Sequence, residues 1–82
     1  MAYMYILISA SRKKYYVGST RDELTERLRR HNTNHDGFTG STNDWVVVYH
    51  EVYENYADAL KREKEIKRKK SRKFIEDLIK KV

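Results

Sequence analysis

The sequence predicts a small α+β domain in which strands and helices follow the order ββαβαα. Three segments rich in aliphatic and aromatic residues have the length of strands, and three others repeat apolar residues at the three-to-four spacing of an amphipathic helix. The connections between them are short and polar, apart from one longer segment in the middle of the chain. With 82 residues, we expect a single domain over residues 1–82 with only a modest core.

The first two elements are expected to form a β-hairpin. Residues 3–8 are apolar or aromatic at every position, which predicts a strand covered on both faces. Residues 11–14 are polar and suit a turn, and residues 15–19 predict the second strand.

A helix should follow the hairpin directly. Thr20 has the character of an N-cap, and Glu23 three residues later would complete a capping box. We expect this helix to run to about residue 32. Residues 32–44 are rich in Asn, Thr and Gly, which is typical of a surface loop able to carry functional contacts.

The last third of the chain predicts one strand and two helices. Residues 45–53 form a strand with a valine-rich centre, and Asn55 can cap a helix that continues to about residue 70. A final helix from Ser71 would bring four apolar side chains to one face. These are Phe74, Ile75, Leu78 and Val82.

Two cationic side chains of the first helix lie close to its apolar stripe. At about 100° per residue, with Leu24 at zero, His31 falls near −20° and Arg27 near −60°. Arg30 falls on the far side, near −120° by the same geometry. Two interpretations remain open: Arg27 and His31 belong to a functional site, or the arginine covers the margin of the core and the histidine is structural.

The second helix carries a carboxylate where an apolar residue would be expected. Tyr56, Ala59, Leu60 and Ile66 form its apolar stripe, and Glu63 lies near the centre of that stripe. A buried carboxylate must be paired, protonated or bound to a metal. The structural alternative is a salt bridge to Lys67 or to an arginine of the first helix.

Tyr5 and Tyr16 lie on neighbouring strands of the expected hairpin and should approach each other. Taken alone, the two tyrosines suit packing better than chemistry. Together with Arg27, His31 and Glu63 they suit a phosphodiester site. In such a site the carboxylate binds a metal, the arginine contacts phosphate and a tyrosine lies near the attacking water.

Charge points to a polyanionic partner. Eighteen Lys and Arg against twelve Asp and Glu leave a net charge of +6, and the excess is concentrated in residues 61–73. This segment either contacts nucleic acid or forms a solvated helix with i,i+4 pairs. It lacks the broad apolar face of a membrane-surface helix. The candidate contacts to nucleic acid are Lys61, Lys69, Lys70, Arg72 and Lys73.

The remaining sequence features favour a soluble, cytoplasmic protein. The chain has no cysteine, so disulfides and thiolate-bound zinc are excluded. The apolar run at the start has no basic region before it and is far shorter than the roughly 20 residues of a membrane span.

Four short motifs in order give the chain a family resemblance. Tyr3-Met4-Tyr5 and Tyr16-Val17-Gly18 are followed by RDELTERLRRHN and then by ALKREKEIK. This arrangement resembles the GIY-YIG nucleases, and most closely their small stand-alone bacterial members. The glycine that opens the first motif in this family is Tyr3 here, a departure that removes no catalytic group but alters how the strand packs.

The resemblance implies a fold, a cofactor and a site. The fold would be a three-stranded antiparallel sheet flanked by helices, with the active site on one sheet face. Glu63 would bind one Mg²⁺ or Mn²⁺, and Gly18 would allow a tight turn into the helix. The catalytic residues that match the family motifs are Tyr5, Tyr16, Arg27, His31 and Glu63.

The same resemblance assigns roles to these residues. Tyr5 would act as or assist the general base, which requires a neighbouring cation to lower its pKa. Tyr16 would position water or phosphate, and Arg27 would neutralise charge on the phosphoryl oxygens. His31 would orient a tyrosine or assist proton transfer.

The sequence therefore predicts a metal-dependent endonuclease that hydrolyses phosphodiester bonds of nucleic acid. DNA is the favoured substrate, in repair or processing of structured DNA. We expect no membrane partner, no small-molecule cofactor, and a monomer or weak dimer. The alternative is a nucleic-acid-binding module of the same fold with little or no turnover.

Overall fold

The structure, a computed structural model, describes residues 1–32 and 44–80 and confirms the α+β class. The elements are β1 (Ala2–Ser9), β2 (Lys14–Thr20), α1 (Leu24–His31), β3 (Trp45–Tyr53), α2 (Tyr56–Lys69) and α3 (Arg72–Lys80). Their order is ββαβαα as expected. The strands form one antiparallel sheet in the order β2-β1-β3. Of the central loop expected over residues 32–44, residues 33–43 lie outside the described residues.

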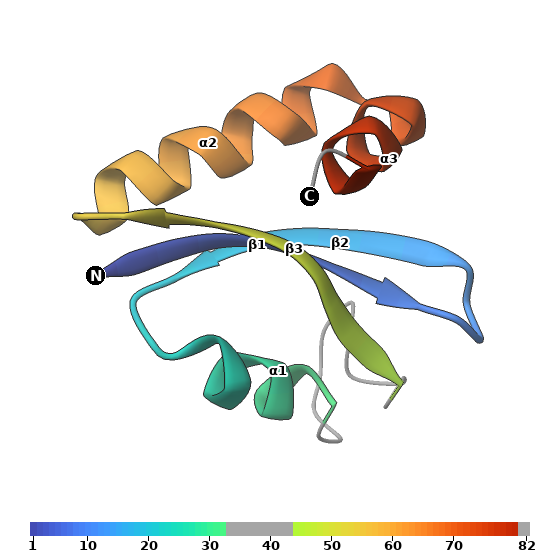
Figure 1. The fold of residues 1–82 in the computed structure, drawn as a ribbon, viewed down its shortest axis with the longest axis horizontal. Helices are drawn as coiled ribbons and strands as arrows, with labels where there is room; N and C mark the ends of the chain where they lie inside the picture. The colour runs from blue at the N-terminus through green and yellow to red at the C-terminus, as the bar shows by residue number, and fades with distance from the viewer. Residues whose placement is uncertain (33–43, 81–82) are drawn as a thin grey trace.

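The sheet lies between two helical layers. Figure 1 shows α1 below the sheet and α2 with α3 above it. Because side chains alternate along a strand, β1 contributes to both sides. Met4 and Ile6 pack with Ile66 and other residues of the α2 and α3 side, whereas Tyr5 and Leu7 pack on the α1 side. The central strand is therefore covered on both faces, as its unbroken apolar run predicts.

The hairpin register fixes which side chains meet. Tyr5 pairs with Gly18, and Leu7 pairs with Tyr16. Tyr16 thus stands two positions along from the residue opposite Tyr5, on the same face of the sheet. The turn closes with Lys13 in the left-handed region, at φ 55, and its backbone N–H donates to the Ser9 carbonyl over 2.8 Å.

The predicted capping box at the start of α1 is wrong. Thr20 is still part of β2, where it pairs with Tyr3, and the helix begins only at Leu24. Thr20 Oγ1 instead accepts a hydrogen bond of 2.9 Å from the Asp22 backbone, which closes a local turn. Glu23 occupies the N-cap position without a side-chain cap bond.

Side chains cap the last two helices, at Asn55 as predicted and at Ser71, where the last helix was expected to begin. Asn55 Oδ1 accepts from the Asp58 N–H over 2.9 Å, and Ser71 Oγ accepts from the Phe74 N–H over 3.1 Å. Between the helices Lys70 adopts a left-handed conformation that ends α2. Phe74, Ile75 and Leu78 pack against the core as expected, while Val82 lies outside the described residues.

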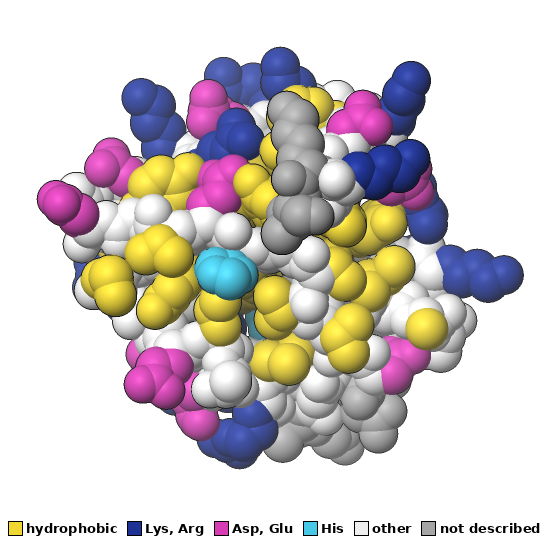
Figure 2. All heavy atoms as spheres, viewed as in Figure 1, with side chains coloured by type: hydrophobic (Ala, Val, Ile, Leu, Met, Phe, Trp, Pro, Cys, Tyr) yellow, Lys and Arg dark blue, Asp and Glu magenta, His cyan; other side chains and the backbone are white. Residues whose placement is uncertain are grey.

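Charged and apolar side chains separate on the surface. Figure 2 shows hydrophobic side chains gathered across the middle of the viewed face, and Lys and Arg side chains standing out above them over α2 and α3. None of the helices described in the structure has the length and apolar character needed to cross a bilayer.

Candidate active site

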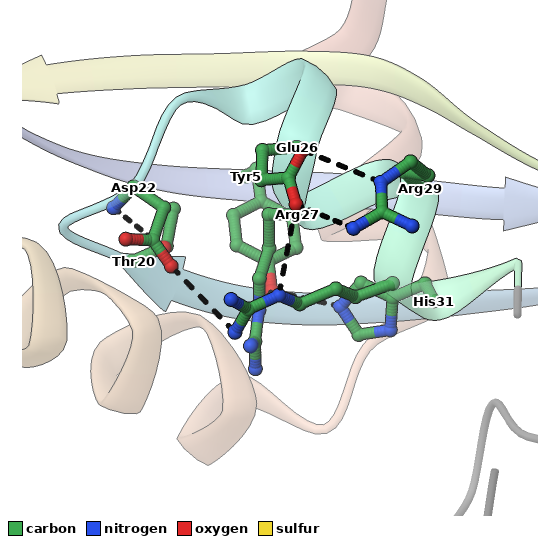
Figure 3. Close-up of polar contacts among 8 residues, drawn as sticks. Tyr5, Thr20, Asp22, Glu26, Arg27, Arg29 and His31 are labelled. Atoms are coloured by element: carbon green, nitrogen blue, oxygen red, sulfur yellow. Dashed lines mark hydrogen bonds and ion pairs between the residues drawn. The ribbon is translucent and has the colours of Figure 1, made fainter.

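The candidate site is built around the phenol of Tyr5. This residue is 1% exposed on β1, and its oxygen lies 2.9 Å from Nε2 of His31 at the end of α1. Arg27 Nε, one turn earlier on α1, donates to the same oxygen over 3.2 Å (Figure 3). The helical geometry of the sequence placed Arg27 and His31 at the apolar stripe, and the structure joins both to Tyr5.

Burial controls the protonation of Tyr5. Desolvation raises the pKa of the phenol from 10.0 to about 12, although the hydrogen bond and the charge of Arg27 oppose the rise. The neighbouring cation that a general-base role requires is therefore present and lowers the pKa, but desolvation is the larger effect and the net pKa is raised. At neutral pH Tyr5 is a neutral phenol that can donate its hydrogen as well as accept one.

Arg27 carries a charge that no carboxylate neutralises by direct pairing within residues 1–32 and 44–80. Its hydrogen bond to Tyr5 raises the pKa of the guanidinium. Arg29 and Arg30, on the outer side of α1, instead form ion pairs with Glu26, and Arg30 also with Asp22. A cleft of about 420 Å³ opens beside Arg27. It is also lined by Ser19, Thr20, Arg21, Asp22 and Tyr56.

Tyr16 connects this cluster to the other side of the sheet. Its ring centroid lies 4.8 Å from that of His31 and 6.5 Å from that of Tyr5. On the opposite side, Lys67 Nζ from α2 lies 5.7 Å from the Tyr16 ring centroid. Because β2 is an edge strand, Tyr16 is in contact range of residues from both helical layers.

Gly18 has a different role from the one predicted. It lies within β2 and not at a turn into the helix, which starts six residues later at Leu24. A Cβ at this position would lie 2.6 Å from both Cζ and the oxygen of Tyr5, and 3.0 Å from Tyr16. Position 18 must lack a side chain so that the phenol of Tyr5 can lie across β2.

Glu63 reaches the site from α2, on the opposite side of the sheet from α1. Its Oε1 accepts from Ser19 Oγ and its Oε2 from Lys67 Nζ, both over 2.5 Å, and its side chain is 14% exposed. Lys67 is thus the salt-bridge partner, as one of the sequence alternatives held. The polar residues therefore do not share one sheet face, as the resemblance implied, but approach one another around the β2 edge.

The donor set around Glu63 limits how a metal could bind. No group of three or more His, Asp or Glu side chains suited to a metal ion occurs among the described residues. Mg²⁺, however, is commonly bound through one or two carboxylates together with substrate phosphates and water. Glu63 therefore fits a metal that is shared with a phosphate ligand, and not one held by protein groups alone.

The basic residues of the 61–73 segment differ in their surroundings. Lys69 Nζ lies 5.5 Å from the Phe74 ring centroid, and both Lys69 and Lys70 are exposed. Arg72 has more contacts, because it pairs with Glu76 over 3.2 Å and donates to the Lys13 carbonyl over 3.0 Å. It therefore links α3 to the hairpin turn. Lys61 and Lys73 are exposed.

A second polar cluster escaped the sequence analysis. Glu51 on β3 accepts from Tyr49 over 2.5 Å, from Tyr53 over 2.6 Å and from Arg62 Nε over 3.0 Å. This cluster lies on the α2 side of the sheet. The signal that could have revealed it is the strand alternation, which places Tyr49, Glu51 and Tyr53 on the same face.

Comparison with known proteins gives one match. Residues 1–75 match the family model described as GIY-YIG catalytic domain. No curated protein and no solved structure shows a significant match to the chain.

Proposed function

The chain belongs to the GIY-YIG catalytic domain family and is therefore a nuclease of nucleic acid, and we propose that it is a divalent-metal-dependent endonuclease whose substrate is structured DNA. The observation that carries this proposal is the chain of contacts from Arg27 through Tyr5 to His31, beside a cleft and with a guanidinium that no described carboxylate pairs. A phosphate is the ligand that such a guanidinium suits best.

In this proposal Tyr5 and His31 move the proton of the attacking water together. A phenol with a pKa of about 12 is seldom ionised at neutral pH, so Tyr5 does not act as a base that is already deprotonated. Its oxygen instead accepts the water proton while its own hydrogen passes to His31 Nε2, 2.9 Å away. Imidazole suits this task because it takes up protons near neutral pH.

Arg27 and Tyr16 act on the phosphate. Arg27 is held by Tyr5 with its charge toward the cleft, where it can stabilise negative charge on the phosphoryl oxygens. Tyr16, against His31, positions the phosphate or the water. As water attacks phosphorus, the bond to the 3′ oxygen breaks and that oxygen leaves.

Glu63 is the residue that would hold Mg²⁺ or Mn²⁺, as its single carboxylate suits a metal shared with the substrate. Such a metal, when bound, supplies positive charge for the phosphate and the departing oxygen. Ser19 and Lys67 orient the carboxylate toward the β2 edge.

The contacts of Glu63 with Ser19 and Lys67 also support the alternative function, a binding module with little turnover. A carboxylate already satisfied by Lys67 and Ser19 can serve the fold alone. We favour the enzyme, because a binding module has no use for a buried phenol that joins a guanidinium to an imidazole. We further propose a cytoplasmic monomer or weak dimer without a small-molecule cofactor.

A cleavage assay tests the proposal. Supercoiled plasmid, single-stranded DNA, branched DNA and RNA would each be incubated with the protein and Mg²⁺ or Mn²⁺, with EDTA as control. We expect metal-dependent cleavage, strongest on branched DNA. Binding to all four without cleavage in either metal would favour the binding module.

A further inference from the structure

An open groove runs beside the β2 edge on the side of α2 and α3. Apart from Tyr16 and Lys67, the residues that line it have no part in the proposed catalytic roles. Its volume is about 410 Å³, within the roughly 300–1,000 Å³ range of ligand pockets. Val17, Ile66 and Ile75 supply aliphatic lining from β2, α2 and α3 respectively. Its lining is therefore contributed by three different elements.

Flat side chains border this groove. Tyr15 and Tyr16 line it from β2. The Arg72 guanidinium lies 5.1 Å from the Tyr15 ring centroid and is held by Glu76 and by the Lys13 carbonyl. Aromatic rings and guanidinium planes are the surfaces on which unstacked nucleic-acid bases stack.

The rim of the groove carries four cationic side chains, of which Lys67 and Arg72 are also paired with the neighbouring carboxylates of Glu63 and Glu76. Lys14, Lys67, Lys70 and Arg72 all line it, and none of the residues lining it is acidic. An apolar lining with such a rim suits a ligand that joins a flat apolar group to negative charge. A nucleotide unit combines a base with a phosphate in this way.

The groove adjoins the proposed active site through Glu63. Lys67 lines the groove and binds one oxygen of Glu63, whereas Ser19 lines the cleft beside Arg27 and binds the other. Tyr16 lines the groove as well and contacts His31. A strand with one nucleotide in the groove can therefore continue to the cleft with its backbone passing Glu63.

We propose that this groove binds one unpaired base of the nucleic-acid substrate. This inference rests on the proposed nuclease function and specifies its substrate class, a strand with at least one unpaired nucleotide beside the cleavage position. A paired base is covered by its stacked neighbours and cannot enter. Base identity matters little, because stacking on rings and guanidinium planes tolerates every base.

Charge-matched ligands separate base binding from phosphate binding. Binding of a short single-stranded oligothymidylate would be compared with that of its all-abasic analogue, which has the same phosphates, in EDTA so that no cleavage occurs. Stacking of one base changes affinity by about 5- to 150-fold. We expect the abasic ligand to bind more weakly by at least about fivefold. Equal affinities would overturn the inference.

A matched pair of variants locates the binding site. Ile75→Phe places a ring in the groove, whereas Ile79→Phe makes the same change one turn later on α3, at a residue that does not line it. We expect the first to remove most of the difference between the two ligands and the second to preserve it. Loss of the difference in both, with both melting like the wild type, would contradict the assignment.

A measurement on the unmodified protein guards against misfolding of Ile75→Phe. Photo-crosslinking with an oligonucleotide that carries 5-iodouracil marks the side chain on which the base stacks. We expect the crosslinked peptide to contain Tyr15 or Tyr16. Crosslinking only to aromatic residues elsewhere, such as Tyr3 or Phe74, would overturn the inference.

These outcomes are distinct from those of the cleavage assay. An inactive protein that prefers oligothymidylate to its abasic analogue would defeat the proposed nuclease and leave the base site standing. An active nuclease that binds both ligands equally would support the proposed function and overturn the assignment of a base-binding site to the groove.

Discussion

The two faces of the sheet each carry a cluster of tyrosine and arginine, and the clusters differ in whether their charge is neutralised. On the α2 side, Glu51 accepts from Tyr49, Tyr53 and Arg62, so the guanidinium has a carboxylate partner. On the α1 side, Tyr5 joins Arg27 to His31, and no carboxylate in the described part of the chain pairs with Arg27. The first cluster is complete without a ligand, whereas the second retains a positive charge beside a cleft.

The protonation of each cluster follows from this difference. Burial by itself would raise the pKa of Glu51, but hydrogen bonds from Tyr49, Tyr53 and Arg62 hold it below its usual range. In the other cluster burial prevails and raises the pKa of Tyr5 to about 12. The Glu51 cluster, in which every charge has a partner, contributes to stability. The Tyr5 cluster, in which Arg27 has no direct carboxylate partner among the described residues, is suited to bind an anionic ligand.

Replacing Arg27 should have the largest effect. Arg27→Ala should slow cleavage by about 10²- to 10³-fold, as loss of one donor to transition-state charge does, with little change in affinity for nucleic acid. Arg30→Ala is the matched control, because Arg30 lies on the outer side of α1 in pairs with Asp22 and Glu26. Single-turnover rates measure both, and equal losses would show that general positive charge, not a site, had been removed.

Glu63→Gln tests whether Glu63 binds a metal next to the cluster of Tyr5, Arg27 and His31. A ligand at 100 times its Kd stabilises a protein by about 2.7 kcal/mol, so Mn²⁺ should raise the melting temperature of the wild type and leave the variant unchanged. In EDTA the two should differ by less than about 1 kcal/mol, because the partner Lys67 is 50% exposed. Equal stabilisation of both proteins by Mn²⁺ would remove Glu63 from the metal site.

Glu51→Gln, in the cluster of Glu51, Tyr49, Tyr53 and Arg62, should lower stability and leave cleavage unchanged. Glutamine keeps the shape but loses the charge and one acceptor function, so Arg62 and two phenols lose their common partner. We expect a loss of about 1–3 kcal/mol in the free energy of unfolding, measured in urea, with an unchanged cleavage rate per folded molecule. A rate loss as large as that of Arg27→Ala would make this cluster part of the site.

Alkaline pH should produce the smallest effect. The pKa of Tyr5 is raised from 10.0 to about 12 by folding, so its contribution to stability is present below pH 10 and is lost as pH rises through 12. Tyr53, with a pKa also raised to about 12, adds to the same loss. Tyr5→Phe should therefore flatten part of the decline between these pH values. An identical decline in wild type and variant would show that Tyr5 titrates normally.

The sequence predicted the element order, and it predicted which residues of the α1 side lie close together, because those signals are local. The positions of Arg27 and His31 follow from helical periodicity, and the approach of Tyr5 and Tyr16 follows from the hairpin. It could not show that Glu63 comes from the opposite helical layer, because layer assignment depends on how α2 packs across the sheet. Gly18 was misread for a similar reason, since its constraint is the ring of a residue 13 positions earlier.

The capping box at Thr20 failed because two local rules competed. The Thr20 hydroxyl can cap a helix or close a turn. Because Thr20 pairs with Tyr3 in the sheet, its hydroxyl closes the turn. The Glu51 cluster was missed because its partner Arg62 lies on α2, eleven residues away in sequence. Such contacts between elements are set by packing and not by spacing along the chain.

One matched pair of substitutions tests most directly whether the cluster of Tyr5, Arg27 and His31 performs the reaction. Tyr5→Phe and Tyr49→Phe each remove a single phenolic oxygen, one bound to Arg27 and His31 and the other to Glu51. Both should lower the free energy of unfolding by roughly 1–3 kcal/mol. Single-turnover cleavage at saturating enzyme should fall by at least about 100-fold in Tyr5→Phe and stay at the wild-type rate in Tyr49→Phe. Equal rates in the two variants would contradict the assignment of the reaction to the Tyr5 side of the sheet.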